Sequence, residues 1–232
     1  MNRESWLANL CLPPRCLLCG AHGAAGIDLC DGCLADLPHN RDCCARCALP
    51  LAQPAALCGH CQQKPPPWQT AWAPFRYAWP LDRLETRYKF SANLAAGRTL
   101  ATLWLQHPPA EMPQAIVPVP LHAARLRQRG YDQAHQLARL IARQMRLPLR
   151  DDGLRRMRGT AAQSRLDAVA RRRNVRGAFE LRTRAPLPAH VALFDDVLTT
   201  GATVGECTRV LRRAGVERVD VWAVARVAGP GR

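Results

Sequence analysis

Four Cys-x-x-Cys pairs lie within residues 16–61, and a thiolate pair with this spacing is a common metal-binding unit. Two intervening residues let one tight turn aim both sulfurs at a single tetrahedral ion. The four pairs form an internal repeat, because the first two pairs, shifted by 28 residues, coincide with the last two. The eight residues are Cys16, Cys19, Cys30, Cys33, Cys44, Cys47, Cys58 and Cys61.

We expect these cysteines to hold two structural Zn²⁺ ions, each closed by four thiolates and therefore without an open catalytic position. Disulfides fit less well, because no secretory signal is visible and cytosolic thiols stay reduced. A redox motif would not occur four times in register. The repeat favours sequential pairing, with Cys16–Cys33 on one ion and Cys44–Cys61 on the other, while a cross-brace arrangement stays open. Cys43 could compete as a ligand.

A second constellation follows an apolar segment near the C-terminus. The apolar run 191–194 ends in Asp195 and Asp196, and a loop of small and hydroxyl residues then opens a helix. Ligands of parallel α/β sheets bind at the carboxyl ends of strands, and a helix start leaves N–H groups that can hold a phosphate. The carboxylates can accept hydrogen bonds from sugar hydroxyls, so one pocket could hold a phosphate and a ribose. The loop residues are Thr199, Thr200, Gly201, Ala202 and Thr203.

Charge is unevenly divided along the 232 residues, whose formal net charge is +15. Residues 1–64 carry no net charge, whereas residues 121–184 contain 17 arginines against five carboxylates. A basic segment of this kind indicates a polyanionic partner, such as single-stranded DNA. Genome composition is an alternative explanation, since 31 of the 33 basic residues are arginine. Eight thiolates outweigh two Zn²⁺, so a phosphate-tracking surface is expected within residues 65–232 rather than in the cysteine repeat.

The elements that would position these residues alternate between strand and helix. Apolar runs predict strands at 115–120, 178–181, 190–194 and 219–227. Helical spacing of apolar residues predicts helices over 82–106, 121–146 and 203–214, with Gln133 on the solvent side of the second. This order predicts an α/β fold with a parallel sheet and flanking helices. The proline run at 65–67 marks the boundary between a double zinc ribbon, 1–64, and the α/β domain, 65–232.

The segment 191–203 resembles the phosphoribosyl pyrophosphate signature of type I phosphoribosyltransferases. Other segments, together with the double ribbon, narrow the resemblance to the ComF family of competence-associated, phosphoribosyltransferase-like proteins. The resemblance covers nearly the whole chain and implies a type I phosphoribosyltransferase-like sheet. The further segments are Pro-Val-Pro-Leu-His at 118–122, Arg-Gly-Tyr-Asp-Gln at 129–133 and Thr-Ala-Ala-Gln-Ser-Arg-Leu at 160–166, with Arg172 and Asn174.

The resemblance implies roles for the matching residues. Asp195 and Asp196 would contact the ribose hydroxyls as the catalytic pair, and the loop 199–203 would cradle the 5′-phosphate. Mg²⁺ would arrive with phosphoribosyl pyrophosphate rather than occupy a protein cage.

The pyrophosphate end of the ligand is assigned in the same way. Pro118 and Val119 open the loop that would face pyrophosphate, and Arg129 and Arg165 would bind it. The arginine-rich segment 155–173 would form a hood over the site.

Three functions stay open at this point. The first is handling of single-stranded DNA in competence and DNA uptake, with phosphoribosyl pyrophosphate as ligand or substrate and DNA-uptake machinery proteins as partners. The second is a metabolic phosphoribosyltransferase that transfers ribose 5-phosphate to a small base or amine. The third is a non-catalytic binding module. The sequence has no uncharged apolar run of about 18 residues, so we expect no transmembrane segment and a cytoplasmic location.

Overall fold

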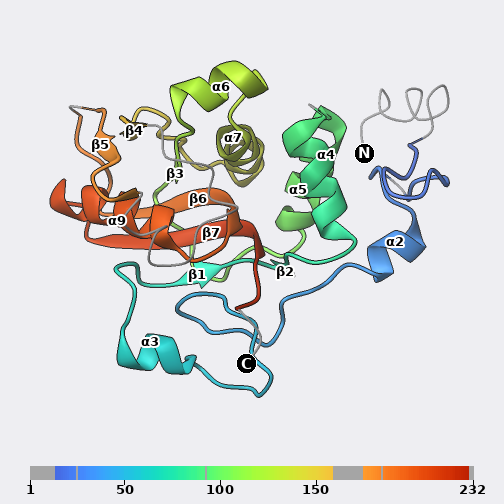
Figure 1. Cartoon of the computed structure of the whole chain (residues 1–232), viewed down its shortest axis with the longest axis horizontal. Coiled ribbons are helices and arrows are strands. Elements are labelled where there is room, and N and C mark those ends of the chain that lie inside the picture. Colours follow the sequence, from blue (N-terminus) through green and yellow to red (C-terminus); the bar gives the residue numbers. More distant parts are fainter. Residues whose placement is uncertain (1–13, 25, 92, 159–174, 184, 230–232) are drawn as a thin grey trace.

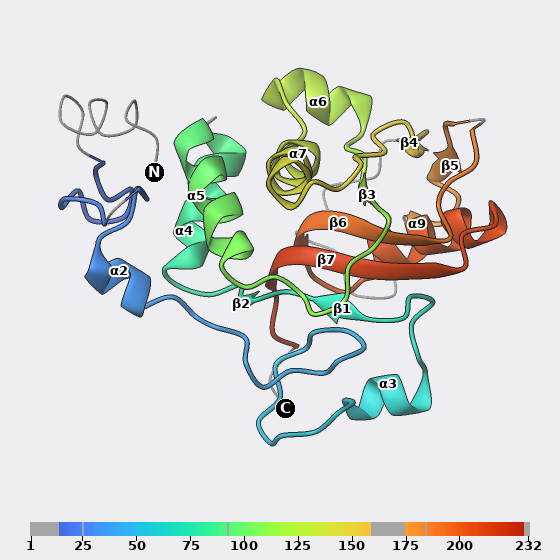
Figure 2. The same cartoon turned by 180° about the vertical axis from the view of Figure 1, so that it is seen from behind.

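The fold was analysed in a computed structural model, which describes residues 14–24, 26–91, 93–158, 175–183 and 185–229. A parallel sheet forms its centre (Figures 1 and 2). The strand order is β1–β7–β6–β3, with β2 also paired to β7, and every one of these pairs is parallel. The strands are β1 (Ala71–Trp72), β2 (Phe75–Arg76), β3 (Ala115–Pro118), β6 (His190–Leu198) and β7 (Arg218–Arg226).

Helices cover both faces of this sheet, and the side chains of β6 show how the layers are built. Successive residues of a strand point to opposite faces. Phe194 packs in one apolar cluster with residues of α4 (Leu81–Phe90), α5 (Leu94–Leu105) and α7 (Gln133–Met145). Leu193 packs in a second cluster with residues of α9 (Ala202–Arg213). The predicted α/β class with a parallel sheet and flanking helices is therefore confirmed.

Two smaller elements complete the α/β part. Strands β4 (Leu154–Arg156) and β5 (Phe179–Leu181) form an antiparallel pair beside the main sheet. Helix α6 (Ala123–Arg129) follows β3 and lies above α7 in Figure 1. No described helix is long and apolar enough to cross a lipid bilayer.

The two cysteine repeats, with the short helices α2 (Asp31–Ala35) and α3 (Gly59–Gln63), pack against different parts of the sheet. Leu29 of the first repeat belongs to the cluster of α4, α5 and α7, whereas Ala48 of the second belongs to the cluster of α9. Residues on both sides of the proline run thus share apolar cores. The domain boundary placed at 64/65 stays a prediction.

The single helix predicted over 121–146 is wrong. Gly130 adopts a left-handed conformation, with φ of 80°, and its N–H donates to the carbonyl of Leu126, which ends α6. Asp132 then caps α7 by accepting from the N–H of His135 at 3.0 Å. The helix predicted over 82–106 is likewise divided, into α4 and α5.

The strand predicted to stop before the acid pair instead continues through it. Pairing between β6 and β7 runs past Asp195 to Leu198, opposite Arg226. The ladder continues because β7 offers backbone partners over the same length. Asp195 and Asp196 therefore sit within a strand, which fixes their backbone more firmly than a loop would.

Candidate functional site

The cysteine sulfurs gather in two tetrads, in the sequential pairing that the repeat favoured. Within each tetrad all four sulfurs lie within 4.8 Å of one another. Cys19 Sγ is 3.6 Å from Cys30 Sγ, and Cys47 Sγ is 3.8 Å from Cys58 Sγ. A tetrahedron with Zn–S bonds of about 2.3 Å has edges of about 3.8 Å, so both tetrads fit a closed Zn²⁺ shell. Cys43 belongs to neither tetrad.

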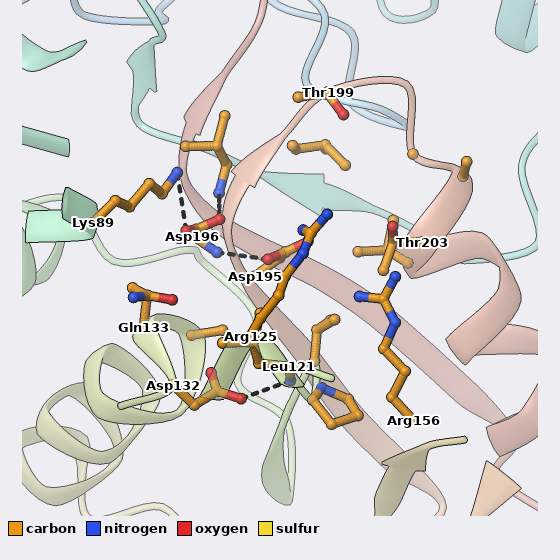
Figure 3. A pocket seen from close by; sticks show the side chains of 18 of the residues that line it. Lys89, Leu121, Arg125, Asp132, Gln133, Arg156, Asp195, Asp196, Thr199 and Thr203 are labelled. Carbon is orange, nitrogen blue, oxygen red and sulfur yellow. Dashed lines mark hydrogen bonds and ion pairs between the residues drawn. The ribbon is translucent and has the colours of Figure 1, made fainter. Parts of the chain in front are cut away.

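A cavity of about 320 Å³, here called the site cavity, opens where β6 gives way to α9 (Figure 3). Parts of the chain far apart in sequence meet there: α4, the loop after β3, α6, the start of α7, β4 and the β6–α9 loop. Asp195 and Asp196 lie on its wall, as do Thr199 and Thr203. The acid pair and the hydroxyl-rich loop thus face one space.

A lysine that the sequence reasoning missed holds the acid pair. Lys89 Nζ lies 2.9 Å from Asp196 Oδ2, with both side chains less than one-fifth exposed. Burial opposes the charged form of Asp196, but the Lys89 ammonium outweighs it and lowers the Asp196 pKa. Burial and the neighbouring Asp196 charge raise the pKa of Asp195 well above its usual range. Of the two carboxyl groups, Asp195 therefore holds a proton more tightly, and Asp196 ionises first.

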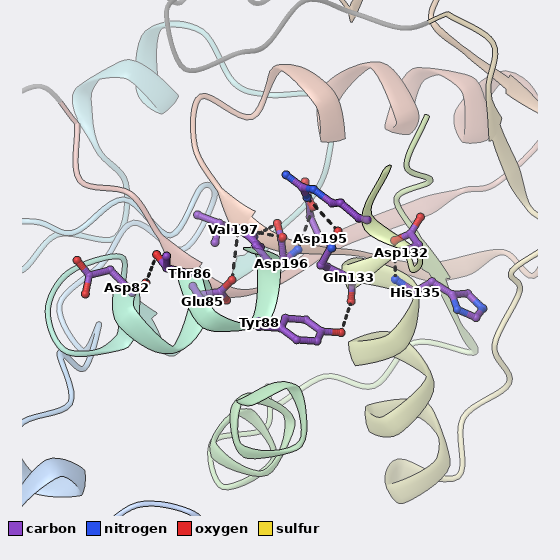
Figure 4. A network of polar contacts seen from close by, with 12 residues as sticks. Asp82, Glu85, Thr86, Tyr88, Asp132, Gln133, His135, Asp195, Asp196 and Val197 are labelled. Carbon is purple, nitrogen blue, oxygen red and sulfur yellow. Dashed lines mark hydrogen bonds and ion pairs between the residues drawn. The ribbon is translucent and has the colours of Figure 1, made fainter. Parts of the chain in front are cut away.

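Lys89 also contacts Glu85, one turn earlier on α4, so that Glu85, Lys89 and Asp196 form a buried chain. Figure 4 shows the two carboxyl groups of this chain, Glu85 and Asp196. Lys89 Nζ lies 3.3 Å from Glu85 Oε2, and the Glu85 side chain is fully buried. Burial raises the pKa of Glu85 to about 7 despite the nearby ammonium. One cation thus faces two carboxylates, and its own pKa is raised because their attraction exceeds the cost of burial.

Asp132 ties the loop after β3 to α7. Its Oδ2 accepts from the N–H of Leu121 at 2.7 Å, while its Oδ1 caps α7. The first residue of that helix, Gln133, is 2% exposed and lines the cavity, which overturns its predicted place on the solvent face. Its Oε1 accepts from Arg129 at 3.1 Å, and its Nε2 has no hydrogen-bond partner among the described residues. A buried unpartnered donor on a cavity wall suits an oxygen-rich ligand.

The loop from Thr199 to Thr203 is braced from behind by an indole. Gly201 has φ of 73°, and a Cβ there would lie 2.7 Å from Trp68 Cη2. Glycine is needed at this position for both reasons. Trp68 Nε1 in turn donates to the carbonyl of Arg46, inside the second cysteine repeat, at 2.7 Å.

Arg226 joins the same repeat to the start of the loop. Its Nε donates to the carbonyl of Cys47 at 2.9 Å, and its Nη1 donates to the carbonyl of Leu198 at 3.1 Å. Nη1 also donates to the carbonyl of Thr199. The second tetrad is thereby connected to the loop by one side chain.

Two arginines bring positive charge to the site cavity. Arg125 and Arg156 both line the cavity, and in Figure 3 both guanidinium groups project into it. Burial and repulsion from Arg125 lower the pKa of Arg156. An anion placed between the two guanidinium groups would relieve that repulsion.

The cavity brings together most, though not all, of the residues that the sequence singled out. Pro118 ends β3 beside Phe194 and does not line the cavity, and Thr200 faces a second hollow instead. Residues 159–173 of the predicted hood, Arg165 among them, lie outside the described residues. The predicted residues that line the cavity are Val119, Arg129, Asp195, Asp196, Thr199, Gly201, Ala202 and Thr203.

Sequence reasoning missed Lys89, Arg125 and Asp132 as parts of the site, whereas Arg156 lies at the start of the predicted hood. For Lys89 a signal was present, because only two of the 33 basic residues are lysines. A lysine in so arginine-rich a chain, one turn after a glutamate on a predicted helix, points to a site that suits a compact ammonium. For Arg125 no such signal exists, since it is one arginine among many.

Comparisons with known proteins found matches to the cysteine repeat and to nearly the whole chain. A family model described as "Double zinc ribbon domain" matches residues 7–66. Competence protein F of Haemophilus influenzae is 36% identical over 225 residues, covering 91% of this chain and 96% of that protein. The chain belongs to the ComF family. A second ComF-family relative, DNA utilization protein YhgH of Salmonella typhimurium, is 35% identical over 94% of this chain and 99% of its own length.

The ComF family also includes more distant relatives. Competence protein ComFC of Streptococcus pneumoniae is 24% identical over 152 residues, which is 66% of each chain. The family resemblance drawn from the motifs is therefore confirmed, and so is the double zinc ribbon at the N-terminal end.

Proposed function

We propose that this ComF-family chain binds phosphoribosyl pyrophosphate in the site cavity and handles single-stranded DNA during DNA uptake. One observation carries the ligand assignment. Asp195 and Asp196, on β6, face the same cavity as the loop 199–203 that opens α9. A phosphate on the loop and a ribose on the carboxylates would then be held by adjacent parts of one continuous segment.

The unequal pKa values of the acid pair suit a sugar with two neighbouring hydroxyls. Asp196, whose pKa is lowered, can accept a hydrogen bond from one hydroxyl. Asp195, whose pKa is raised, holds a proton more readily and can then donate as well as accept. Lys89 offsets the charge of Asp196, so the pair would bind the ribose with less repulsion toward a phosphorylated ligand.

The cationic side of the cavity suits the pyrophosphate group. Arg125, Arg129 and Arg156 line it, and the Nε2 of Gln133 adds a neutral donor. Among the described residues, the cysteine tetrads are the only groups of three or more side chains placed to hold one metal ion. A dedicated Mg²⁺ cage therefore does not fit, and in this proposal Mg²⁺ enters bound to the pyrophosphate.

These residues could support transfer of the phosphoribosyl group as well as binding. The bond from the anomeric carbon of ribose to pyrophosphate would break, and a new bond would form to a nitrogen of the acceptor. The arginines would stabilise the departing pyrophosphate, and the acid pair would hold the electron-poor ribose in place. Pyrophosphate release over a panel of nucleobases and amines separates a transferase from a binding module.

The DNA part of the proposal is supported by charge and by the relatives. Two relatives bear the names competence protein F and DNA utilization protein YhgH. The net charge of +15 is carried by residues 65–232, as a polyanion-binding surface requires. Handling of imported strands would place the chain in the cytoplasm, in contact with DNA-uptake machinery proteins.

Calorimetric titration with phosphoribosyl pyrophosphate and Mg²⁺ tests the ligand assignment. We expect Asp195→Asn with Asp196→Asn to weaken binding by about tenfold or more, because charge-assisted hydrogen bonds are lost. A matched control is Asp151→Asn with Asp152→Asn, an adjacent acid pair that does not line the cavity. Equal affinity of the two double variants would contradict the assignment.

A further inference from the structure

We infer that a second hollow, between the second cysteine repeat and α9, holds the sugar–phosphate backbone of a single-stranded nucleic acid. This inference rests on the proposed function and identifies the surface on which the DNA would bind. The hollow, here called the ribbon groove, has a volume of about 510 Å³ and is open on one side. Its walls are α3, the proline run 65–67, Trp68, residues 175–176 and one side of α9.

Cations dominate the described lining of the ribbon groove. Lys64, Arg176, Arg209 and Arg213 are exposed there, and Glu206 is the one carboxylate among the described residues that line it. Glu206 is already engaged, since it accepts from the N–H of Gly177 at 2.9 Å and pairs with Arg209 at 2.9 Å.

Three of the four groove cations have no ion-pair partner within the described chain. Lys64, Arg176 and Arg213 form none, so their charges are directed to solvent and to any bound polyanion. A row of unpaired cations on both sides of an open groove matches the repeating charge of a phosphate backbone.

Two of the four groove cations are aligned by α9. Gly205, Arg209 and Arg213 are spaced by four residues, so they lie along one side of the helix. Pro67 and Trp68 lie against its first turn at Gly205, where a Cβ would be 3.4 Å from the indole. The two arginines extend the same side beyond that contact.

The ribbon groove meets the site cavity at the phosphate loop. Gly201 and Ala202 line both hollows, whereas Thr200 lines only the groove. A strand in the groove would therefore pass directly behind the residues proposed to cradle a 5′-phosphate.

The groove contacts backbone rather than bases. Its one indole, Trp68, is 4% exposed and is covered by Gly201 and Gly205, so it offers no face for stacking. The other ring among the described lining residues is the imidazole of His60. Binding in the groove should then depend on salt and charge and be indifferent to base sequence. A nucleic acid is favoured over an acidic peptide because the neighbouring site is proposed to take a sugar phosphate.

Fluorescence anisotropy with labelled oligothymidylate tests the inference on the full-length, zinc-loaded protein. We expect Arg209→Gln with Arg213→Gln to reduce the slope of log affinity against log salt by about 0.7 for each lost phosphate contact. Glu206→Gln should instead tighten binding, since it removes a negative charge and keeps an acceptor for Gly177.

The matched control is Arg139→Gln with Arg143→Gln on α7. These arginines are also exposed, unpaired with any described carboxylate and four residues apart, but they line neither hollow and lie on the other side of the sheet. We expect this control to keep the wild-type salt slope. Oligoadenylate should bind the wild type as tightly as oligothymidylate.

The outcomes separate the groove from the function on which it rests. The wild type could bind DNA while the α9 and α7 double variants weaken that binding equally. This result would overturn the assignment of the groove and leave DNA handling intact. Absence of binding by the wild type would overturn both. Polyglutamate that competes with the oligonucleotide at equal charge, with the same dependence on Arg209 and Arg213, would overturn the assignment to nucleic acid.

Discussion

The ammonium of Lys89 lies 2.9 Å from Asp196 Oδ2 and joins the candidate site to the interior of α4. Through Lys89 the acid pair is linked to Glu85, which is fully buried one turn away. A single cation thus sets the ionisation of three carboxyl groups. The charges of the site are thus arranged before any ligand binds. This arrangement depends on α4, a helix that the phosphoribosyl pyrophosphate signature does not include.

Removal of the Lys89 charge should destabilise the fold as well as the site. We expect Lys89→Met to lower the free energy of unfolding by about 3 kcal/mol, because it leaves buried carboxylates without a counter-charge. Urea denaturation followed by circular dichroism measures the change. The double variant Lys89→Met with Glu85→Gln should lose less free energy of unfolding than the two single variants together, since it removes one of the uncompensated charges.

The control for this prediction is the other lysine. Lys64 is exposed and forms no ion pair with a described residue, so Lys64→Met should change stability by no more than about 0.5 kcal/mol. Equal losses at both lysines would show that Lys89 acts as an ordinary surface charge.

Burial of Glu85 predicts a specific pH dependence of stability. Its pKa in the folded chain is about 7, above the ordinary value of 4.5, so between these values the folded state holds the proton more tightly. The stabilisation by this group is complete below pH 4.5 and is lost as pH rises through about 7. We expect the stability of the wild type relative to Glu85→Gln to fall by about 3 kcal/mol over this range.

Chemical denaturation at a series of pH values measures that difference. Glu180→Gln is the comparison, because Glu180 is exposed and forms a surface pair with Arg155. An exposed pair contributes little to stability, so this difference should change less than that of Glu85→Gln. A flat profile for Glu85→Gln would contradict the buried chain of charges.

The two tetrads should differ in their effect on the candidate site. Cys61→Ser and Cys19→Ser should each reduce bound zinc from two ions to one, as elemental analysis would show. Loss of the second ion should also weaken phosphoribosyl pyrophosphate binding by about tenfold, roughly 1.4 kcal/mol, because Arg226 and Trp68 connect that repeat to the loop. Cys19→Ser, in the first tetrad, should bind phosphoribosyl pyrophosphate more tightly than Cys61→Ser, in the second. The reverse order would show that the Arg226 connection does not position the loop.

Features built from contiguous residues could be predicted from the sequence, whereas contacts between distant segments could not. The cysteine repeat, the strand of Val191–Phe194 and the Thr-rich loop are contiguous, so spacing and polarity identify them. Lys89 reaches the site only through tertiary packing, from a helix about 100 residues away in the chain, and no periodicity encodes that meeting. Gln133 was misplaced because the break at Gly130 and the cap at Asp132 rotate the first turn of α7 toward the cavity.

The central claim is that a phosphorylated ribose binds between the acid pair and the loop 199–203. A crystal structure of the zinc-loaded protein with phosphoribosyl pyrophosphate and Mg²⁺ tests it most directly. We predict ribose hydroxyls within hydrogen-bond distance of Asp195 and Asp196, and the 5′-phosphate on the N–H groups of the loop. A ligand bound elsewhere, or ribose hydroxyls turned away from both carboxyl groups, would contradict the claim.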